Sequence, residues 1–281
     1  MVSLCYACGS CDNECPVNRR TGQLSPRKIV RAYVLGYKDE TLFLPDVWYC
    51  IQCGQCGNVC PMNVKPFEVI RDLRDRLAQK KPEIYQGVFR QLQELKKKFH
   101  KIRYFVFDKV LNRAIEEQEI AEYVSEWERL DLPTEIIKES KESLLLKASG
   151  NIVLADKPFL KYFDFPTNIR SCLSCGSCTN ACPVSVNTKL FSPMRIFRMV
   201  RWGTLEEIIS DPAVWLCIDC GRCVNVCPQK VKGLWILRVI REHAVSTELV
   251  DSGFVSLWKA VDQHLYKEYC KAITRVCQSL V

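Results

Sequence analysis

The fold of this chain is decided by residues 5–16, which read CYACGSCDNECP, and by three later stretches with the same pattern. These are CIQCGQCGNVCP at residues 50–61, CLSCGSCTNACP at residues 172–183 and CIDCGRCVNVCP at residues 217–228. We call them the first, second, third and fourth run. Every run has the spacing C-x2-C-x2-C-x3-C-P, with a glycine directly after its second cysteine. The four runs contain sixteen of the 18 cysteines, namely Cys5, Cys8, Cys11, Cys15, Cys50, Cys53, Cys56, Cys60, Cys172, Cys175, Cys178, Cys182, Cys217, Cys220, Cys223 and Cys227.

This spacing is typical of cysteines that hold [4Fe-4S] clusters in bacterial ferredoxins. Three thiolates at such a tight pitch converge on one cluster, while the fourth points elsewhere and the proline turns the chain away. The glycine lets the backbone approach an inorganic sulfur. Structural zinc sites use two separated C-x2-C pairs instead. The sequence therefore predicts four [4Fe-4S] clusters, with zinc sites and free structural thiols as the alternatives.

The resemblance of the runs to two-cluster ferredoxins implies which cysteines share a cluster. In those ferredoxins the fourth cysteine of each run ligates the cluster of the other run. The implied sets are Cys5, Cys8, Cys11 with Cys60; Cys50, Cys53, Cys56 with Cys15; Cys172, Cys175, Cys178 with Cys227; and Cys217, Cys220, Cys223 with Cys182. Ligation within each run is the alternative.

The two halves of the chain are copies of one module. A shift of 167 residues lays residues 5–61 on residues 172–228 without a gap, and about half of the aligned positions are identical. The matches extend beyond the cysteines, for example from Ser25 and Pro26 to Ser192 and Pro193. We call these halves the first copy and the second copy.

The segments between the cysteine runs carry helix signals. Ser25 and Ser192 can each cap a helix, a proline follows in the first turn, and Gly36 and Gly203 can end the helices. Apolar residues at helical spacing predict another helix after each closing proline, at residues 67–77 and 234–240. No alternating strand pattern lies near a run, so we expect an all-α fold of two tandem helical ferredoxin modules joined by a helical linker.

The expected division is a first module at residues 1–82, a linker at 83–165, a second module at 166–245 and a C-terminal helical segment at 246–281. In the linker, apolar residues form one helical face and Pro133 and Gly150 bracket a later helix. Its apolar positions are Ile84, Val88, Leu92, Leu95, Phe99 and Ile102. We expect the linker to pack between the modules. The alternative is a partner-docking surface, suggested by the aromatic residues at 104–107 and 159–165.

Composition and charge narrow the class of protein. The chain has 281 residues, of which 48% are hydrophobic and 26% charged, as in globular proteins. It contains no apolar run of the roughly 18–20 residues that span a membrane, and a first cysteine at position 5 leaves no room for a secretory signal. We therefore expect a cytoplasmic protein. The formal net charge is +8, but four oxidised clusters with their thiolates would add about −8, so a nucleic-acid partner is not expected.

The basic residues near the runs are interpreted as compensation for the charge of the clusters. They are Arg19, Arg20, Lys65, Arg170, Arg222, Lys230 and Lys232. The sequence has no G-x-G-x-x-G, P-loop, H-E-x-x-H or adjacent Cys-Cys pair, and its three histidines are isolated. We therefore expect no catalytic site of its own. Cys270 and Cys277, seven residues apart, are expected to be ordinary buried thiols.

The paired runs, the capped helix between them and the tryptophan two residues before the second and fourth runs resemble the C subunit of heterodisulfide reductase. That family is built on the helical ferredoxin module of succinate dehydrogenase and fumarate reductase iron–sulfur subunits. The resemblance covers about residues 1–80 and 167–245. It implies an electron relay between two further subunits, an A type that contains flavin and a B type that handles disulfide chemistry with noncubane clusters.

This chain departs from the family in one respect, because the usual C subunit has one module and two clusters. The complex is therefore either methanogen-type, heterodisulfide-reductase-like as in sulfur oxidisers, or another anaerobic flavin-based oxidoreductase. The rival functions are a free-standing polyferredoxin that carries electrons by diffusion and a chain that reduces a disulfide itself.

Overall fold

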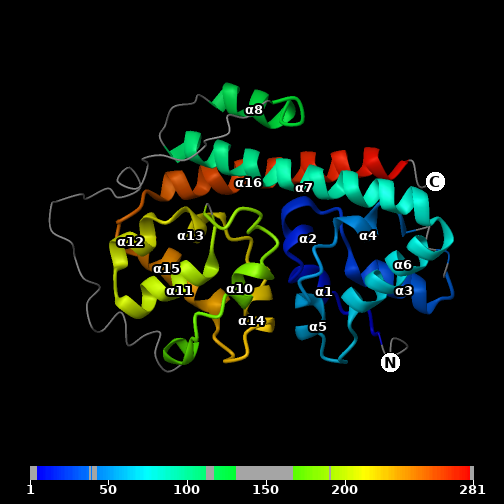
Figure 1. The fold of residues 1–281 in the computed structure, drawn as a ribbon, viewed down its shortest axis with the longest axis horizontal. Helices are drawn as coiled ribbons and strands as arrows, with labels where there is room; N and C mark the ends of the chain where they lie inside the picture. Colours follow the sequence, from blue (N-terminus) through cyan, green and yellow to red (C-terminus); the bar gives the residue numbers. More distant parts are fainter. Residues whose placement is uncertain are drawn as a thin grey trace. The chain divides into compact units, whose positions relative to one another are not determined.

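The computed structural model describes residues 5–37, 39, 43–111, 117–130, 167–189 and 191–278. Within these ranges every regular element is a helix and none is a strand (Figure 1), which confirms the all-α prediction. In the same ranges, no helix combines the length and the apolar character needed to cross a membrane.

The chain divides into two compact units, residues 1–99 with 261–281, and residues 100–260. The division falls within α7 (Pro82–Leu111) and α16 (Ser252–Cys277), which contribute to both units. The first unit also contains α1 (Ser10–Asn13), α2 (Pro16–Thr21), α3 (Pro26–Val34), α4 (Asp46–Tyr49), α5 (Gln55–Asn58) and α6 (Pro66–Lys80). The second unit also contains α8 (Glu117–Ser125), η3 (Ile169–Ser171), α10 (Ser177–Asn180), α11 (Pro193–Trp202), α12 (Leu205–Ser210), α13 (Pro212–Leu216), α14 (Arg222–Asn225) and α15 (Gly233–Ser246). The four-part division expected from the sequence stays a prediction.

The helices between the runs begin and end as the sequence indicates. The Ser25 hydroxyl accepts a hydrogen bond from the Lys28 amide at the start of α3, and Ser192 caps α11 in the same way. Gly203 ends α11 in the left-handed conformation at φ +77°. The corresponding Gly36 follows α3 at φ +95°. Glycine suits these turns because it has no Cβ to clash.

The core of the first unit forms where α3 packs on α6. Val30, Ile70 and Leu73 are fully buried there, together with Cys270 and Cys277 of α16. Burial raises the pKa of both thiols to about 12, so they remain protonated at neutral pH. The prediction that Cys270 and Cys277 are ordinary buried thiols agrees with this placement.

The apolar face predicted along residues 84–102 forms one side of α7, with one exception. Val88, Leu92, Phe99 and Ile102 are buried and Leu95 is partly buried, whereas Ile84 is 46% exposed. Ile84 lies in the first turn of α7, before the part of the helix that packs into the core. Ile84 therefore belongs to the apolar face but lies outside its buried part.

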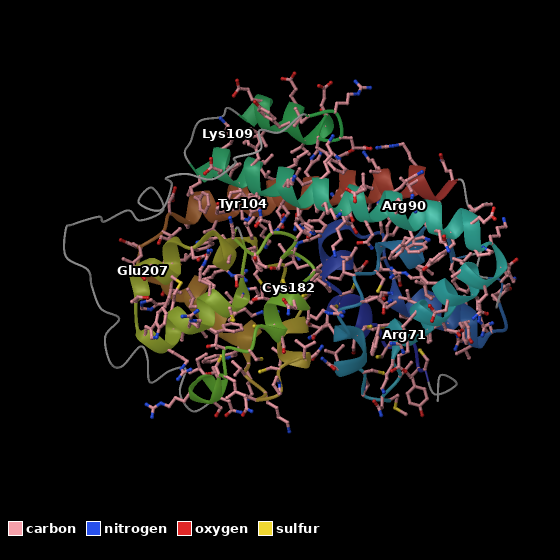
Figure 2. All side chains as sticks on the ribbon, viewed as in Figure 1. Arg71, Arg90, Tyr104, Lys109, Cys182 and Glu207 are labelled. Atoms are coloured by element: carbon pink, nitrogen blue, oxygen red, sulfur yellow. The ribbon has the colours of Figure 1, made fainter. Side chains whose placement is uncertain are left out.

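The core of the second unit is formed by α11, α12, α13 and α15, with Ile196, Ile208 and Ile236 fully buried. Tyr104 and Phe107 of α7 are also buried in this unit. Figure 2 labels Tyr104 on α7. Phe107 packs edge-on against the ring of Trp258, with centroids 4.9 Å apart. These two side chains therefore do not form an exposed docking surface, and that part of the alternative interpretation is wrong. The helix expected between Pro133 and Gly150 and the aromatic residues at 159–165 lie outside the described residues.

Candidate metal centres

The four cysteine runs share one backbone conformation. In each run the residue just before the second cysteine and the glycine just after it are left-handed. The pairs are Ala7 (φ +55°) and Gly9 (+88°), Gln52 (+54°) and Gly54 (+83°), Ser174 (+52°) and Gly176 (+81°), and Asp219 (+56°) and Gly221 (+68°). A four-residue helix then contains the third cysteine of each run. Turns of this kind point successive backbone N–H groups into a concavity that suits an anion, as in many iron–sulfur sites.

Each copy brings its two runs together through these short helices. In the first unit α1 packs on α5, and in the second unit α10 packs on α14 (Figure 1). The third cysteine of one run therefore lies on a helix that contacts the helix of the other run. This packing brings the two runs of each copy close together.

The first hollow lies in the first copy and is lined by thiols from two runs. Cys5, Cys8 and Cys11 of the first run line it together with Cys60, the last cysteine of the second run. The remaining lining is largely apolar and includes Val64. The polar side chains of the lining are the four thiols, Tyr6, Ser10 and Arg27. Thiolate sulfur is the ligand that iron–sulfur clusters use.

The second copy has an equivalent hollow. Cys172, Cys175 and Cys178 of the third run line it together with Cys227, the last cysteine of the fourth run. Cys223 also reaches its wall. The two hollows thus combine three cysteines of one run with the closing cysteine of the other.

The remaining thiols of the first copy also approach one another across the runs. The pKa of the Cys15 thiol is raised to about 12, mainly by burial and in part by the nearby thiols of Cys50 and Cys53. Cys15 in turn contributes to the raised pKa of Cys56, which is due first to burial and then to Cys50 and Cys53. The closing cysteine of the first run therefore lies among the first three cysteines of the second run.

The second copy repeats this second grouping. Burial raises the pKa of Cys220 to about 12, with further contributions from Cys217 and from Cys182, which closes the third run. Cys182, labelled in Figure 2, lies in the second unit together with Cys217 and Cys220. Among the described residues, no set of three or more His, Cys, Asp or Glu side chains is arranged to hold a single metal ion.

Solvent access differs between the groups of thiols. Cys8 and Cys175 are exposed, whereas Cys15, Cys56 and Cys220 are buried. At Cys8 the hydroxyl and backbone of Ser10 lower the thiol pKa, and Ser177 does the same at Cys175. The sulfur–hydroxyl distances are 3.4 and 3.3 Å. Among the cysteines of the four runs, Cys8 and Cys175 are thus the two that are exposed at the surface of their unit.

Backbone amides donate to cysteine sulfur at equivalent places in the two copies. The amides of Gln52 and Asp219 lie 3.4 Å from the sulfur atoms of Cys50 and Cys217. The amides of Val64 and Val231 donate in the same way to Cys60 and Cys227, at 3.3 and 3.4 Å. Such N–H···S contacts stabilise negative charge on sulfur.

Some of the basic residues near the runs have carboxylate partners. Arg20 pairs with Asp262 at 3.2 Å and Lys65 pairs with Glu68 at 3.5 Å. These two charges are therefore balanced in part by acids of the protein. The wider role of basic residues in balancing cluster charge stays a prediction.

Two arginines that were not predicted from the sequence reach the runs from neighbouring helices. Arg74 of α6 donates to the carbonyls of Val47 and Cys50 and stacks over the indole of Trp48, 4.9 Å from its centroid. Arg241 of α15 pairs with Asp219 in the fourth run at 2.7 Å. The same shift of 167 residues relates the two arginines. Extending the repeat comparison beyond the last cysteine would have found them.

Comparison with known proteins places these features in a family context. Residues 1–64 match a model of a 4Fe-4S dicluster domain, and residues 164–231 match a second model with the same description. Each copy thus corresponds to one dicluster domain. No solved structure is significantly similar to the chain.

Curated relatives are named as C subunits of heterodisulfide reductases. The C 2 iron–sulfur subunit of CoB–CoM heterodisulfide reductase from Methanocaldococcus jannaschii is 43% identical over 79 residues, which are 28% of this chain and 41% of that protein. The C subunit of the H2:CoB–CoM heterodisulfide, ferredoxin reductase from Methanothermobacter thermautotrophicus is 38% identical over 101 residues, 36% of this chain and 51% of that protein. A protein from Archaeoglobus profundus, named as similar to the C subunit of heterodisulfide reductase, is 37% identical over 75 residues, 27% of this chain and 40% of that protein. The chain therefore spans about half, or less, of the length of these relatives, and its resemblance to the C subunit is confirmed.

Proposed function

We propose that this chain holds four [4Fe-4S] clusters, two in each copy, and serves as an electron-transfer subunit. The observation that carries the proposal is the meeting of three thiols of one run with the closing thiol of the other. It recurs in both hollows, at Cys60 and at Cys227. This arrangement supports the crossed ligand sets over ligation within each run.

The donor set fits such a cluster. The hollows present thiols against largely apolar walls, and the left-handed turns direct backbone N–H groups toward the same space. A bound [4Fe-4S] cluster supplies one-electron redox chemistry. The residues of the chain would hold the cluster, donate N–H···S hydrogen bonds to its ligands and exclude water from the buried thiols Cys56 and Cys220.

The partners follow from the relatives. Because these are named as C subunits of heterodisulfide reductases, we propose a hetero-oligomeric complex. In it the chain would relay electrons between a flavin-containing A-type partner and a noncubane-cluster B-type partner. A cytoplasmic location is part of this proposal. The second dicluster domain would lengthen the relay or serve a further partner.

Metal analysis tests the cluster content. Protein purified without oxygen should contain about 16 iron and 16 sulfide per chain, four of each per cluster. Zinc at one ion per four cysteines, with little iron, would overturn the proposal.

Single cysteine variants test the crossed ligation. Cys60→Ser should disturb the cluster of Cys5, Cys8 and Cys11, and Cys15→Ser should disturb the cluster of the second run. Electron paramagnetic resonance of each variant identifies the affected cluster. If each variant loses only the cluster held by the run that contains the replaced cysteine, the four cysteines of each run ligate one cluster and the crossed sets are wrong.

Electron transfer in the complex tests the relay. The isolated chain should be reduced by dithionite but show no turnover with a disulfide. The assembled complex should lose turnover when Cys175→Ser removes a cluster of the second copy, whereas full activity would place that copy off the path. Stable co-purification with A-type and B-type partners supports the relay, and purification as a lone carrier would favour a free-standing polyferredoxin instead.

A further inference from the structure

The equivalent arginines Arg74 and Arg241 approach the second and fourth runs, but they contact different side chains there. The residue that differs is the left-handed one before the second cysteine, which is Gln52 in the second run and Asp219 in the fourth. Its backbone is the same in both copies, at φ +54° and +56°. Its amide also makes the same contact with the first cysteine of the run, at 3.4 Å. The two sites therefore differ at this position by a side-chain charge.

In the first copy the arginine faces neutral groups. Arg74 donates to the carbonyls of Val47 and Cys50 and, among the described residues, forms no ion pair. Burial lowers its pKa, but a guanidinium stays charged in proteins. The Gln52 amide nitrogen lies 3.7 Å from the Cys50 sulfur and can donate to it. The thiol therefore faces donors and a positive charge.

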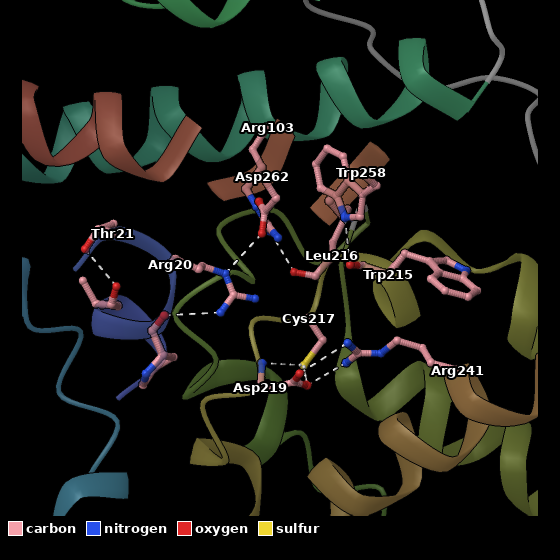
Figure 3. A network of polar contacts seen from close by, with 12 residues as sticks. Arg20, Thr21, Arg103, Trp215, Leu216, Cys217, Asp219, Arg241, Trp258 and Asp262 are labelled. Carbon is pink, nitrogen blue, oxygen red and sulfur yellow. Dashed lines mark hydrogen bonds and ion pairs between the residues drawn. The ribbon is translucent and has the colours of Figure 1, made fainter. Parts of the chain in front are cut away.

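In the second copy the arginine faces a carboxylate. The guanidinium of Arg241 donates to both oxygens of Asp219, at 2.7 and 3.4 Å (Figure 3). The two side chains are only 22% and 20% exposed. One Asp219 oxygen lies 3.8 Å from the Cys217 sulfur. Burial opposes the charge of Arg241, but Asp219 and then the nearby Cys217 sulfur raise the pKa of its guanidinium. The carboxylate and the thiol therefore share one guanidinium.

This sharing has an electrostatic consequence. A carboxylate beside a cluster ligand repels an added electron, and it takes hydrogen bonds that the guanidinium would otherwise give to sulfur. Both effects oppose reduction. Arg222 lies beside Cys220 where the first copy has Gln55, and its charge acts in the opposite direction. The effect of Asp219 is therefore to be measured within its own site and not as a difference between the copies.

We propose that Asp219, held by Arg241, sets the reduction potential of the cluster of Cys217, Cys220, Cys223 and Cys182 below the value that a neutral residue would give. This inference rests on the proposed function. Asp219 acts through the Cys217 sulfur and the guanidinium, so it is a positioning residue. It is the only one of the four left-handed residues before a second cysteine that carries a charge, the others being Ala7, Gln52 and Ser174.

The test exchanges the charge in both directions. Asp219→Asn should raise the midpoint potential of the fourth-run cluster, and Gln52→Asp should lower that of the second-run cluster. Both replacements tolerate the left-handed backbone, since Asn and Asp adopt it more readily than other residues with a Cβ. The readout is a redox titration of the full chain followed by electron paramagnetic resonance, which needs no enzymatic turnover.

The control is Glu242→Gln. Glu242 adjoins Arg241 on α15 and is exposed, so its replacement removes the same charge without touching a thiol. It should move the midpoint potential less than Asp219→Asn does, because water screens an exposed charge. An unchanged potential in both Asp219→Asn and Gln52→Asp, with four iron per cluster retained, would overturn the inference. Loss of iron from the wild-type protein would overturn the proposed function instead.

Discussion

The two copies share the left-handed turns of their runs and differ in the side chains around them. In the first copy the buried carboxylate of Asp12 accepts hydrogen bonds from the hydroxyl of Ser25 and from the amide and guanidinium of Arg27, at 2.8, 2.9 and 3.1 Å. In the second copy Thr179 occupies the place of Asp12, and its hydroxyl accepts from the amide of Met194 at 3.1 Å. Both arrangements tie the short helix of a run to the start of α3 or α11. An ion pair and a neutral hydroxyl can therefore perform the same structural task.

Packing differs between the copies in a compensating way. Gly233 at the start of α15 lies directly under the ring of Phe197, where an added Cβ would clash. The first copy has Pro66 and the smaller Val30 at these positions. The missing side chain of Gly233 thus leaves room for the ring of Phe197. The two copies therefore keep the same cysteines and turns, whereas the two residues of this packing contact both differ between the copies.

The largest expected effect concerns an ion pair found in the second copy. Asp211 is 3% exposed, caps α13 through the Ala213 amide and binds Arg195 through both oxygens, at 2.5 and 2.8 Å. The first copy has Leu44 and Lys28 in their places. The Arg195 side chain is 40% exposed, so it stays hydrated when the carboxylate is removed. Asp211→Ala removes the cap of α13 and the charge-assisted hydrogen bonds to Arg195, and should cost about 2–3 kcal/mol of unfolding free energy. Anaerobic urea denaturation followed by circular dichroism measures the loss, and a cost below about 1 kcal/mol would show that the pair is dispensable.

The packing exchange predicts the next effect. Gly233→Ala forces its new methyl group against Phe197 and should destabilise the second unit by about 1–3 kcal/mol. Adding Phe197→Val, the residue of the first copy, should recover part of this loss by opening space. Thermal unfolding of the single and double variants tests the coupling. Additive effects of the two substitutions would contradict the proposed clash.

A pH-dependent effect is expected near Asp211. Burial raises the pKa of Tyr104 to about 12, and the charges of Asp108 and Asp211 add to the shift. The unfolded tyrosine has a pKa of about 10, so above pH 10 the unfolded state loses its proton first and stability falls as the pH rises toward 12. Between pH 9 and 11 the wild-type protein should therefore lose about 1.4 kcal/mol more than Tyr104→Phe. Urea denaturation at both pH values measures the difference, and equal losses would argue against the raised pKa.

The smallest expected effect concerns the hydrogen bond between the Thr179 hydroxyl and the Met194 amide in the second copy. Thr179→Val keeps the shape of the side chain but removes the acceptor for the Met194 amide, and should cost about 1 kcal/mol. The control is Thr247→Val at an exposed position, where a change within about 0.5 kcal/mol is expected. Urea denaturation compares the two variants. An equal cost at both positions would mean that the buried hydroxyl does not hold α10 to α11.

The sequence predicted the features that depend on local signals. The caps at Ser25 and Ser192 and the helices after the closing prolines follow from residues within one turn, so the all-α fold could be predicted. The burial of Tyr104 could not be predicted. The sequence around an aromatic residue on α7 is the same whether or not another helix covers that residue. Arg74 and Arg241 were missed for a related reason. Each lies more than a dozen residues after its run and reaches it only through the packing of α6 or α15.

The left-handed position before each second cysteine has a consequence for protein engineering. Ala, Gln, Ser and Asp all occupy it with nearly the same φ, so the loop accepts varied side chains there without changing its course. A non-glycine residue in this conformation costs about 1–2 kcal/mol, which the rest of the loop tolerates in all four runs. Each run therefore offers one position at which the surroundings of a sulfur can be redesigned while every ligand stays in place.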